Sequence, residues 1–287
     1  MEPPPGYGNQ GESIKFLLKS LYSLKQARCK WYDTLVHTLT DEGFHVSDAD
    51  PGIFYAHDGD DITMLATHVD DCVITRTSKD LIADYKQRLD AVFSLTDLGG
   101  IHWLLRIKIM RDQQARTILL SQTTYIKTIL DRFSLSDAKP YATPIVPGAN
   151  YTRSQAPADA AEADYMRKIP YREAIGSLMY ATVATRPDIT FAISTLSQFL
   201  DNPGRIHWEA VKRIFRYLSR TKTHALTYGN ECHHLTGFTD ADGSSQEHHH
   251  AISGYVFLID GEAVSWVVLL TAQPDLFDYL AIINQIK

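Results

Sequence analysis

The feature that most restricts the fold is a pair of adjacent aspartates inside an otherwise apolar stretch. Residues 62–69 are largely apolar, Asp70 and Asp71 interrupt them, and residues 72–75 resume the apolar pattern. This pattern predicts a strand, a tight turn and a second strand. Adjacent carboxylates at a hairpin tip repel each other unless a cation neutralises them. The dipeptide alone leaves two interpretations open: a solvated turn, which is common, or part of a two-metal site.

Composition excludes several classes of protein. The 287 residues suffice for one large domain or for two to three small ones. No apolar run approaches the roughly 20 residues that a membrane helix needs, and the Pro/Gly-rich start is unlike a signal peptide. The three cysteines lie far apart, which is typical of a reducing compartment and predicts no disulfide framework. We expect an intracellular protein, in the cytoplasm or nucleus, without a membrane partner.

The charge is unevenly distributed along the chain. The net charge of −6 argues mildly against a nucleic-acid enzyme, because such proteins are more often basic. Residues 15–31, however, carry five basic side chains and no acidic one, and residues 203–224 carry six Lys or Arg against Glu209. Two interpretations stay open for these basic strips: solvated helix faces, or surfaces that follow phosphates.

Hydrophobic periodicity predicts a mixed chain of helices and strands. We expect helices over residues 14–42, 81–93, 123–133, 171–184, 187–200 and 207–219. We expect further strands over residues 103–110, 117–121, 235–239 and 252–266, the last a hairpin turning at Asp260 and Gly261. Residues 134–170, with five prolines, are the best linker candidate. The four tryptophans are expected to be core anchors.

Six blocks of sequence follow one another between residues 12 and 268. They are LLKSLYSLKQARCKWY at 17–32, HVDD at 68–71, LGGIHWLLRIKI at 98–109, LSQTTYI at 120–126, PYR, GSLMY and TRPDI within 170–189, and TDAD and SGYVF within 239–257. In this order and spacing the blocks resemble those of Ty1/copia-type retrotransposon Pol polyproteins, from mid-palm of a reverse transcriptase into an RNase H domain.

The resemblance implies an α/β (α+β) fold with four parts. They would be a partial reverse-transcriptase palm with the start of the thumb at 1–133, a linker at 134–170, a helical thumb or connection at 171–230 and a truncated RNase H-like domain at 231–287.

The resemblance also implies catalytic roles. Asp70 and Asp71 correspond to the metal-binding aspartates of the polymerase box, which would bind Mg²⁺ (or Mn²⁺). Asp240 corresponds to the first RNase H carboxylate. Lys25 and Gln26 would lie on the helix that contacts the template and the incoming nucleotide in the family.

Arg213 and Arg216 belong to a helix that would link the thumb and RNase H regions, where they are expected to contact phosphates. The expected partner is therefore a primer–template of RNA or DNA.

Departures from the family pattern limit the expected activity. The family places a further metal-binding aspartate upstream of a segment that residues 1–7 resemble, so we expect an incomplete metal site and a longer polyprotein that supplies the missing palm segment. Ser23, Arg28 and Arg106 stand where the family has Gly, Pro and Gly, and are expected to crowd the bound strands. After Trp266 the pattern ends, so Asp240 is expected to lack its catalytic partners.

The expected function is that of a retrotransposon-derived reverse transcriptase fragment, a nucleotidyltransferase by descent that is inactive alone. Two alternatives remain: a regulatory protein that binds nucleic acid without chemistry, and a non-functional remnant of a transposable element. An incomplete palm also predicts an uncovered sheet edge or apolar face, and hence poor solubility.

Overall fold

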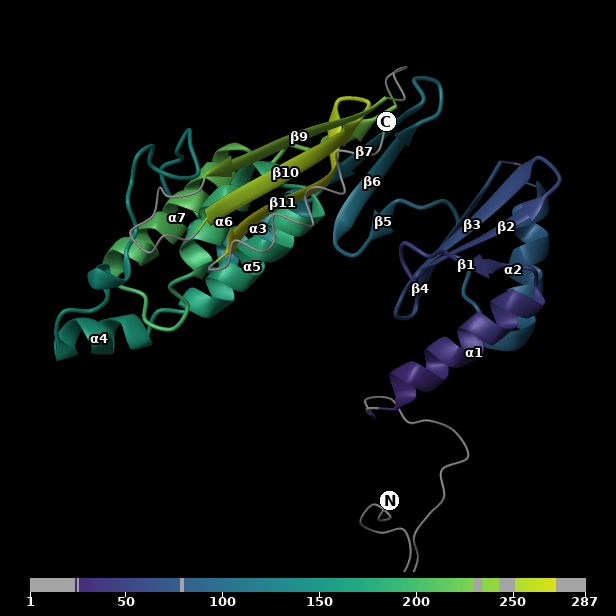
Figure 1. Ribbon diagram of the computed structural model, residues 1–287, viewed down its shortest axis with the longest axis horizontal. Helices are drawn as coiled ribbons and strands as arrows, with labels where there is room; N and C mark the ends of the chain where they lie inside the picture. Colours follow the sequence, from purple (N-terminus) through teal and green to yellow (C-terminus); the bar gives the residue numbers. More distant parts are fainter. Residues whose placement is uncertain (1–23, 25, 78–79, 230–233, 243–250, 272–287) are drawn as a thin grey trace, which may run out of the picture. The chain divides into compact units, whose positions relative to one another are not determined.

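The computed structural model describes residues 24, 26–77, 80–229, 234–242 and 251–271. The chain divides into two compact units, Met1–Gly100 and Ile101–Lys287, which are described separately (Figure 1). Both units combine helices with antiparallel sheets, which confirms the mixed α/β class. Among the helices in the described ranges, none is long and apolar enough to cross a membrane.

The first unit is a four-stranded antiparallel sheet with two helices against one face (Figure 1). Its elements are α1 (Ala27–Asp41), β1 (His45–Val46), β2 (Ile53–Asp58), β3 (Asp61–His68), β4 (Asp71–Arg76) and α2 (Asp80–Phe93), with the strands in chain order. Phe54, Ala56 and Leu65 alternate along β2 and β3 and are buried against Leu39 of α1 and Leu89 of α2. This period of two is typical of a sheet with one solvated face.

Helix α1 ends at the glycine that the sequence indicated. Gly43 has a φ of +86°, and the next amide, that of Phe44, donates a 2.9 Å hydrogen bond to the carbonyl of Leu39. A left-handed glycine after a helix turns the chain back and satisfies the last carbonyls. The turn also brings Phe44 into the core, where it is buried. The expected helix start at residue 14 lies outside the described residues, but Leu24 and Gln26 are described and are not helical, so the prediction of one continuous helix over residues 14–42 is wrong there.

The second unit packs helices against two antiparallel sheets, ordered β5-β6-β7-β8 and β11-β10-β9. Its elements are β5 (Trp103–Leu104), β6 (Ile107–Asp112), β7 (Thr117–Ser121), α3 (Thr123–Arg132), the short 3₁₀ helix η1 (Arg153–Gln155), α4 (Ala160–Arg167), α5 (Tyr171–Ala184), the 3₁₀ helix η2 (Pro187–Ile189), α6 (Thr190–Ser197), α7 (Arg205–Arg220), β8 (Leu226–Tyr228), β9 (Leu235–Asp242), β10 (Ala251–Ile259) and β11 (Glu262–Thr271).

Helices α3, α5, α6 and α7 share one core. On α7 the predicted stripe of Trp208, Val211, Phe215 and Leu218 is buried, which confirms the 3.6-residue pattern. The division between the units falls before β5, whereas the sequence suggested a boundary at residue 133. Helix α3 belongs to the second unit because its buried face packs on α5 and α7.

Residues 134–170, predicted to be a linker, pack on the helical core instead. Tyr151 and Met166 are both buried in it. Helix α4 is capped by Asp159, whose side chain accepts a 2.8 Å hydrogen bond from the amide of Glu162. A capped helix and buried side chains make this segment an integral part of the second unit. The prolines indicated irregular backbone, but they did not indicate whether that backbone is packed.

The expected strand over residues 103–110 is interrupted. Leu105 and Arg106 have φ values of +46° and +61°, and they form the turn between the short strands β5 and β6. Arg106 is the position where the family has glycine, and its left-handed backbone is the conformation that glycine adopts without steric cost. Arg106 therefore occupies a turn position that glycine would adopt more readily.

The predicted hairpin of β10 and β11 turns at Asp260 and Gly261, as expected. Strand β11 extends beyond Trp266 to Thr271, still paired with β10. The indole nitrogen of Trp266 donates a 3.0 Å hydrogen bond to the carbonyl of Thr182 on α5. The sheet is thereby held on the helical core of its own unit.

Candidate active site and nucleic-acid surface

The Asp70–Asp71 pair lies at a tight hairpin, as the sequence predicted. His68 at the end of β3 pairs with Asp71 at the start of β4, so Val69 and Asp70 alone make the turn. Both aspartates are exposed. Val69 has a φ of +58°, which a β-branched residue rarely adopts. The hairpin therefore presents two adjacent carboxylates at its tip on a constrained backbone.

Trp31 of α1 holds this turn from the side. Its indole nitrogen donates a 3.1 Å hydrogen bond to the carbonyl of Val69, the residue before Asp70. Its ring contacts Phe93 of α2 edge-on, with centroids 5.3 Å apart. Trp31 is 38% exposed, so the prediction of a core anchor is wrong for this residue. A hydrogen bond between residues 38 positions apart leaves no local signal in the sequence.

The negative charge at the turn affects the pKa of the neighbouring thiol of Cys72. Desolvation raises the pKa of Cys72, and the negative charges of Asp71 and Asp70 raise it further. Two adjacent carboxylates create a potential that disfavours any additional negative charge. The raised pKa favours the neutral thiol of Cys72, which is a weaker nucleophile than a thiolate.

The two carboxylates are the type of ligand that a magnesium ion prefers, but they are too few to complete its coordination. Mg²⁺ takes oxygen ligands in octahedral geometry, and Asp70 and Asp71 offer only such donors. Within the described residues there is no group of three or more His, Cys, Asp or Glu side chains that could hold a metal. A magnesium site at this turn would need more ligands than the two carboxylates found in the described residues.

Of the two residues proposed for template contact, the structure describes Gln26, at the start of α1. Gln26 occupies the N-cap position, is exposed, and makes no side-chain capping bond. Lys25 lies outside the described residues. Gln26 and Trp31 belong to the same helix, so one element carries both a candidate nucleic-acid contact and the residue that holds the aspartate turn.

Asp240, the candidate RNase H carboxylate, lies in the middle of β9 and pairs across the sheet with Gly254 of β10. Its side chain is exposed and accepts a 2.9 Å hydrogen bond from the amide of Ala241. The side chain of Asp242 lies outside the described residues. Around Asp240, the described part of the chain contains no group of metal-ligating side chains.

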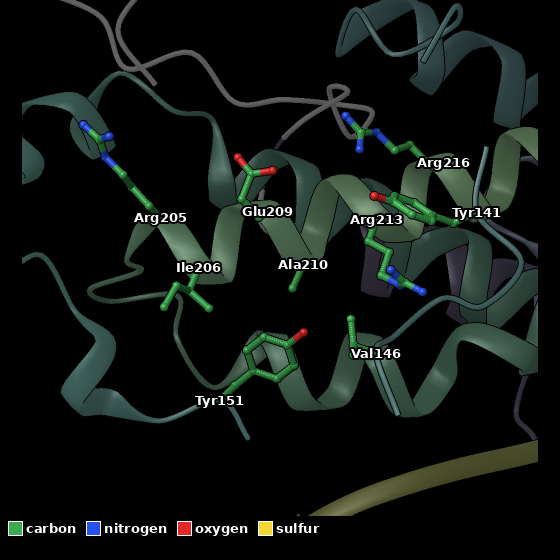
Figure 2. A pocket seen from close by; sticks show the side chains of 9 residues that line it. All are labelled: Tyr141, Val146, Tyr151, Arg205, Ile206, Glu209, Ala210, Arg213 and Arg216. Atoms are coloured by element: carbon green, nitrogen blue, oxygen red, sulfur yellow. The ribbon is translucent and has the colours of Figure 1, made fainter. Parts of the chain in front are cut away.

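Arg213 and Arg216 extend from one side of α7 over the ring of Tyr141, with guanidinium carbons 4.3 Å and 5.5 Å from its centroid (Figure 2). Arg213 also donates hydrogen bonds to the carbonyl and the hydroxyl of Thr143, at 3.2 Å and 2.8 Å. Stacking and hydrogen bonding restrict the rotamers of these long side chains. Tyr141 and Thr143, which order the arginines, were not predicted because they lie about 70 residues earlier in the chain.

A model of the reverse transcriptase (RNA-dependent DNA polymerase) family matches residues 1–147 of this chain, more than half of its length. The segment includes the hairpin with Asp70 and Asp71. The chain is thus a member of the reverse transcriptase class.

Known relatives narrow the family. The chain is 38% identical over 270 residues to the retrovirus-related Pol polyprotein from transposon TNT 1-94 of Nicotiana tabacum, covering 93% of this chain and 20% of that protein. It is 33% identical over 271 residues to the Pol polyprotein from transposon RE1 of Arabidopsis thaliana, covering 93% of this chain and 18% of that protein.

A shorter relative, the putative transposon Ty5-1 protein of Saccharomyces cerevisiae, is 29% identical over 272 residues, covering 93% of this chain and 85% of that protein. The chain belongs to the Ty1/copia-type retrotransposon Pol family and spans about a fifth of the length of the first two relatives. No solved structure matches it.

Proposed function

We propose that this chain carries part of the catalytic palm of an RNA-directed DNA polymerase, with Asp70 and Asp71 as metal ligands. The observation that carries the proposal is the two-residue turn that presents both carboxylates together, within the segment matched by the reverse transcriptase family. When bound there, Mg²⁺ would activate the attacking oxygen and stabilise the leaving oxygen of phosphoryl transfer. Trp31 would keep the turn, and hence the carboxylates, in one orientation.

We further propose that the chain has negligible polymerase activity alone. Phosphoryl transfer depends almost wholly on positioning and on neutralising charge, and two carboxylates are too few for two metal ions. The described residues offer no third metal ligand beside them. A longer polyprotein would supply the further ligand.

The proposed partner is a primer–template of RNA and DNA, inside the cell in the cytoplasm or nucleus. Lys25 and Gln26 would contact the template region, and Arg213 and Arg216 would contact phosphates. Asp240 would be the remaining carboxylate of an RNase H-like sheet. These roles rest on family membership and, for the two arginines, on their ordered guanidinium groups.

A second candidate is binding of nucleic acid without chemistry. It is favoured by the combination of ordered arginines on α7 with an incomplete set of metal ligands in the described residues. A binding isotherm on a primer–template at several salt concentrations separates this candidate from a non-functional remnant. Phosphate contacts would make affinity fall as salt rises.

Primer extension with Mg²⁺ tests the polymerase proposal. The chain alone is expected to extend no primer. In a second experiment, this chain replaces the matching segment of the tobacco TNT 1-94 polyprotein, and the resulting chimera is expected to extend primers. Asp70→Asn or Asp71→Asn in the chimera should lower the extension rate at least about 100-fold, since each substitution removes a metal ligand. The unexchanged polyprotein sets the reference rate.

Asp60→Asn is the matched control, because Asp60 lies at the tip of the other hairpin of the same sheet, between β2 and β3. It is expected to leave extension unchanged. Extension by the chain alone that Asp70→Asn abolishes would refute the inactivity. If the chimeric polyprotein extends primers equally well with and without the Asp70→Asn and Asp71→Asn substitutions, the catalytic assignment of these aspartates is refuted.

A further inference from the structure

The turn between β3 and β4 is of type II′. A two-residue turn in a β-hairpin is of type I′, with a positive φ at both residues, or of type II′, with a positive φ at the first residue only. Val69 has a φ of +58°, whereas the φ of Asp70 is not positive. The turn at residues 260–261, with φ values of +56° and +82°, shows the type I′ pattern in the same chain.

The two residues of this turn do not favour type II′ by themselves. The first position of that type is normally glycine, as in the other hairpin turn of the same sheet, where Gly59 has a φ of +61° and precedes Asp60. Val69 is β-branched, and a positive φ is costly for such a side chain. Asp70, in contrast, tolerates the positive φ that type I′ would give it. A strained turn persists only where the surrounding structure determines it.

Trp31 acts on the central peptide group of the turn. Types I′ and II′ differ in the orientation of the peptide group that joins Val69 to Asp70. The carbonyl of that group accepts the 3.1 Å hydrogen bond from the indole nitrogen of Trp31. In a type I′ turn the peptide group would be reversed, so its N–H group would face the indole N–H group, and neither donor could accept from the other. The bond thus stabilises type II′, and its loss would favour type I′.

The indole of Trp31 is held in place from two sides. The ring of Phe93 meets it edge-on, with an interplanar angle of 71°. Helix α1 continues from Trp31 to Leu35 and Leu39, which are buried in the core of the first unit. A donor on a packed helix fixes the geometry of its acceptor more precisely than a donor on a loop.

We propose that Trp31 is a positioning residue that selects the type II′ turn and thereby sets the direction of the Asp70 carboxylate. A reversal of the central peptide group changes the sign of φ at Asp70, which redirects its side chain relative to that of Asp71. The distance and the angle between the two carboxylates therefore depend on the turn type. The inference rests on the proposed role of these aspartates as metal ligands and adds to it the group that determines their relative orientation.

Solution NMR of the full chain, with labelled valine and aspartate, measures the turn type. The amide protons of Val69 and Asp70 are close in type I′ and far apart in type II′, so a strong cross-peak between them marks the reversed turn. We expect a weak cross-peak in the parent chain and a strong one in Trp31→Phe, which keeps a ring against Phe93 but removes the hydrogen-bond donor. All samples carry Phe238→Lys, because a charge on the exposed strand β9 opposes self-association.

A second substitution separates turn selection from packing. Val69→Gly added to Trp31→Phe creates the same Gly-Asp pair that forms a type II′ turn at residues 59–60, so this double variant should regain the weak cross-peak. Val69→Asn added to Trp31→Phe should not regain it, because asparagine favours type I′. Tyr32→Phe is the matched control on α1: it removes the 3.0 Å hydrogen bond from the Tyr32 hydroxyl to the carbonyl of Pro51 and should leave the cross-peak weak.

Primer extension by the chimeric TNT 1-94 polyprotein relates the turn type to the proposed reaction. Trp31→Phe should lower the extension rate at least about fivefold, the change in equilibrium expected from the loss of one hydrogen bond. Val69→Gly added to Trp31→Phe should restore the rate, and Tyr32→Phe should leave it unchanged. A purely structural role of the Trp31 ring would not be rescued by glycine at residue 69.

Three results would overturn the inference. They are a strong cross-peak in the parent chain, a weak cross-peak in Trp31→Phe, and a reversed turn that leaves the rate unchanged in a chimera that requires Asp70. A different result concerns the proposed function alone. If Trp31→Phe reverses the turn and Val69→Gly restores it, but the chimera extends no primer or does not depend on Asp70, the selection of the turn by Trp31 stands and the catalytic role of the aspartates is refuted.

Discussion

Arg186 is the largest of the fully buried side chains in the described part of the chain. Its guanidinium donates to both carboxylate oxygens of Asp188, at 2.9 Å and 2.7 Å, and to the carbonyl and hydroxyl of Thr221, at 3.1 Å and 2.6 Å. Tyr217 donates a further hydrogen bond to Asp188. The network joins the start of η2 to the end of α7, so the TRPDI block has a structural role that the family resemblance did not assign.

Replacing Arg186 by methionine is expected to lower the free energy of unfolding by about 2–3 kcal/mol, because the carbonyl and hydroxyl of Thr221 lose their donor and Asp188, whose side chain is 33% exposed, loses its cationic partner. Urea denaturation measures this. The matched control is Arg172→Met, since the Arg172–Asp201 pair is exposed on both sides and should be worth at most about 1 kcal/mol. Equal losses for the two variants would contradict the role assigned to burial.

The pH dependence of this network has a definite sign. Burial alone would raise the pKa of Asp188, but hydrogen bonding to Arg186 and its positive charge outweigh burial and lower that pKa. A lowered folded-state pKa contributes stability that is present above the unfolded pKa of about 3.9 and is lost as pH falls through the folded value. The loss in Arg186→Met should therefore shrink in acid below about pH 4.

Strand β9 is the element most exposed to solvent in the second sheet. Within the described residues it pairs only with β10, and Leu235 and Phe238 are 61% and 57% exposed. The sequence predicted an uncovered edge for the palm sheet, whereas this edge belongs to the β11-β10-β9 sheet of the second unit. An edge strand with large apolar side chains favours pairing with another chain.

The isolated chain is therefore expected to self-associate, and Phe238→Lys to reduce the association, because a charge on an edge strand opposes pairing. Size-exclusion chromatography with light scattering measures the mass. Val183→Lys adds the same charge at a 74% exposed position of α5 and should leave the association unchanged. A monomeric parent protein would refute the prediction.

The molecule contains two separate cores in its described part. Leu65 and Leu89 belong to the core of the first unit, and Leu178 and Phe215 to that of the second. The cores share no residue and fall on either side of the division at Gly100. Each unit therefore has the apolar burial that a cooperative folding unit requires.

Leu65→Ala is expected to lower the stability of the first unit by about 2–5 kcal/mol, through lost burial and the cavity left behind, and to leave the second unit unaffected. Leu178→Ala should have the converse effect. Hydrogen exchange followed by mass spectrometry resolves protection in each segment. A parallel loss of protection in both units from either variant would show that they unfold together.

Sequence patterns determined what depends on neighbouring residues. The aspartate hairpin, the C-terminal end of α1, both ends of α5, the buried stripe of α7 and the turn at Asp260 follow from local periodicity and turn chemistry, which act over a few residues. The motif order likewise led to the reverse transcriptase family, which the comparisons confirm. The break of the strand at Arg106 was missed because apolar periodicity does not report a positive φ.

Only the tertiary structure showed which residues that lie far apart in the sequence contact one another. The bond from Trp31 to the turn before Asp70, the placement of Arg213 on Tyr141 and Thr143, and the packing of residues 134–170 each join positions far apart in the chain. Such contacts depend on how complete elements pack, which local preference does not specify. The sequence identified Asp70 and Asp71 and the basic helix α7; only the fold showed what orders them.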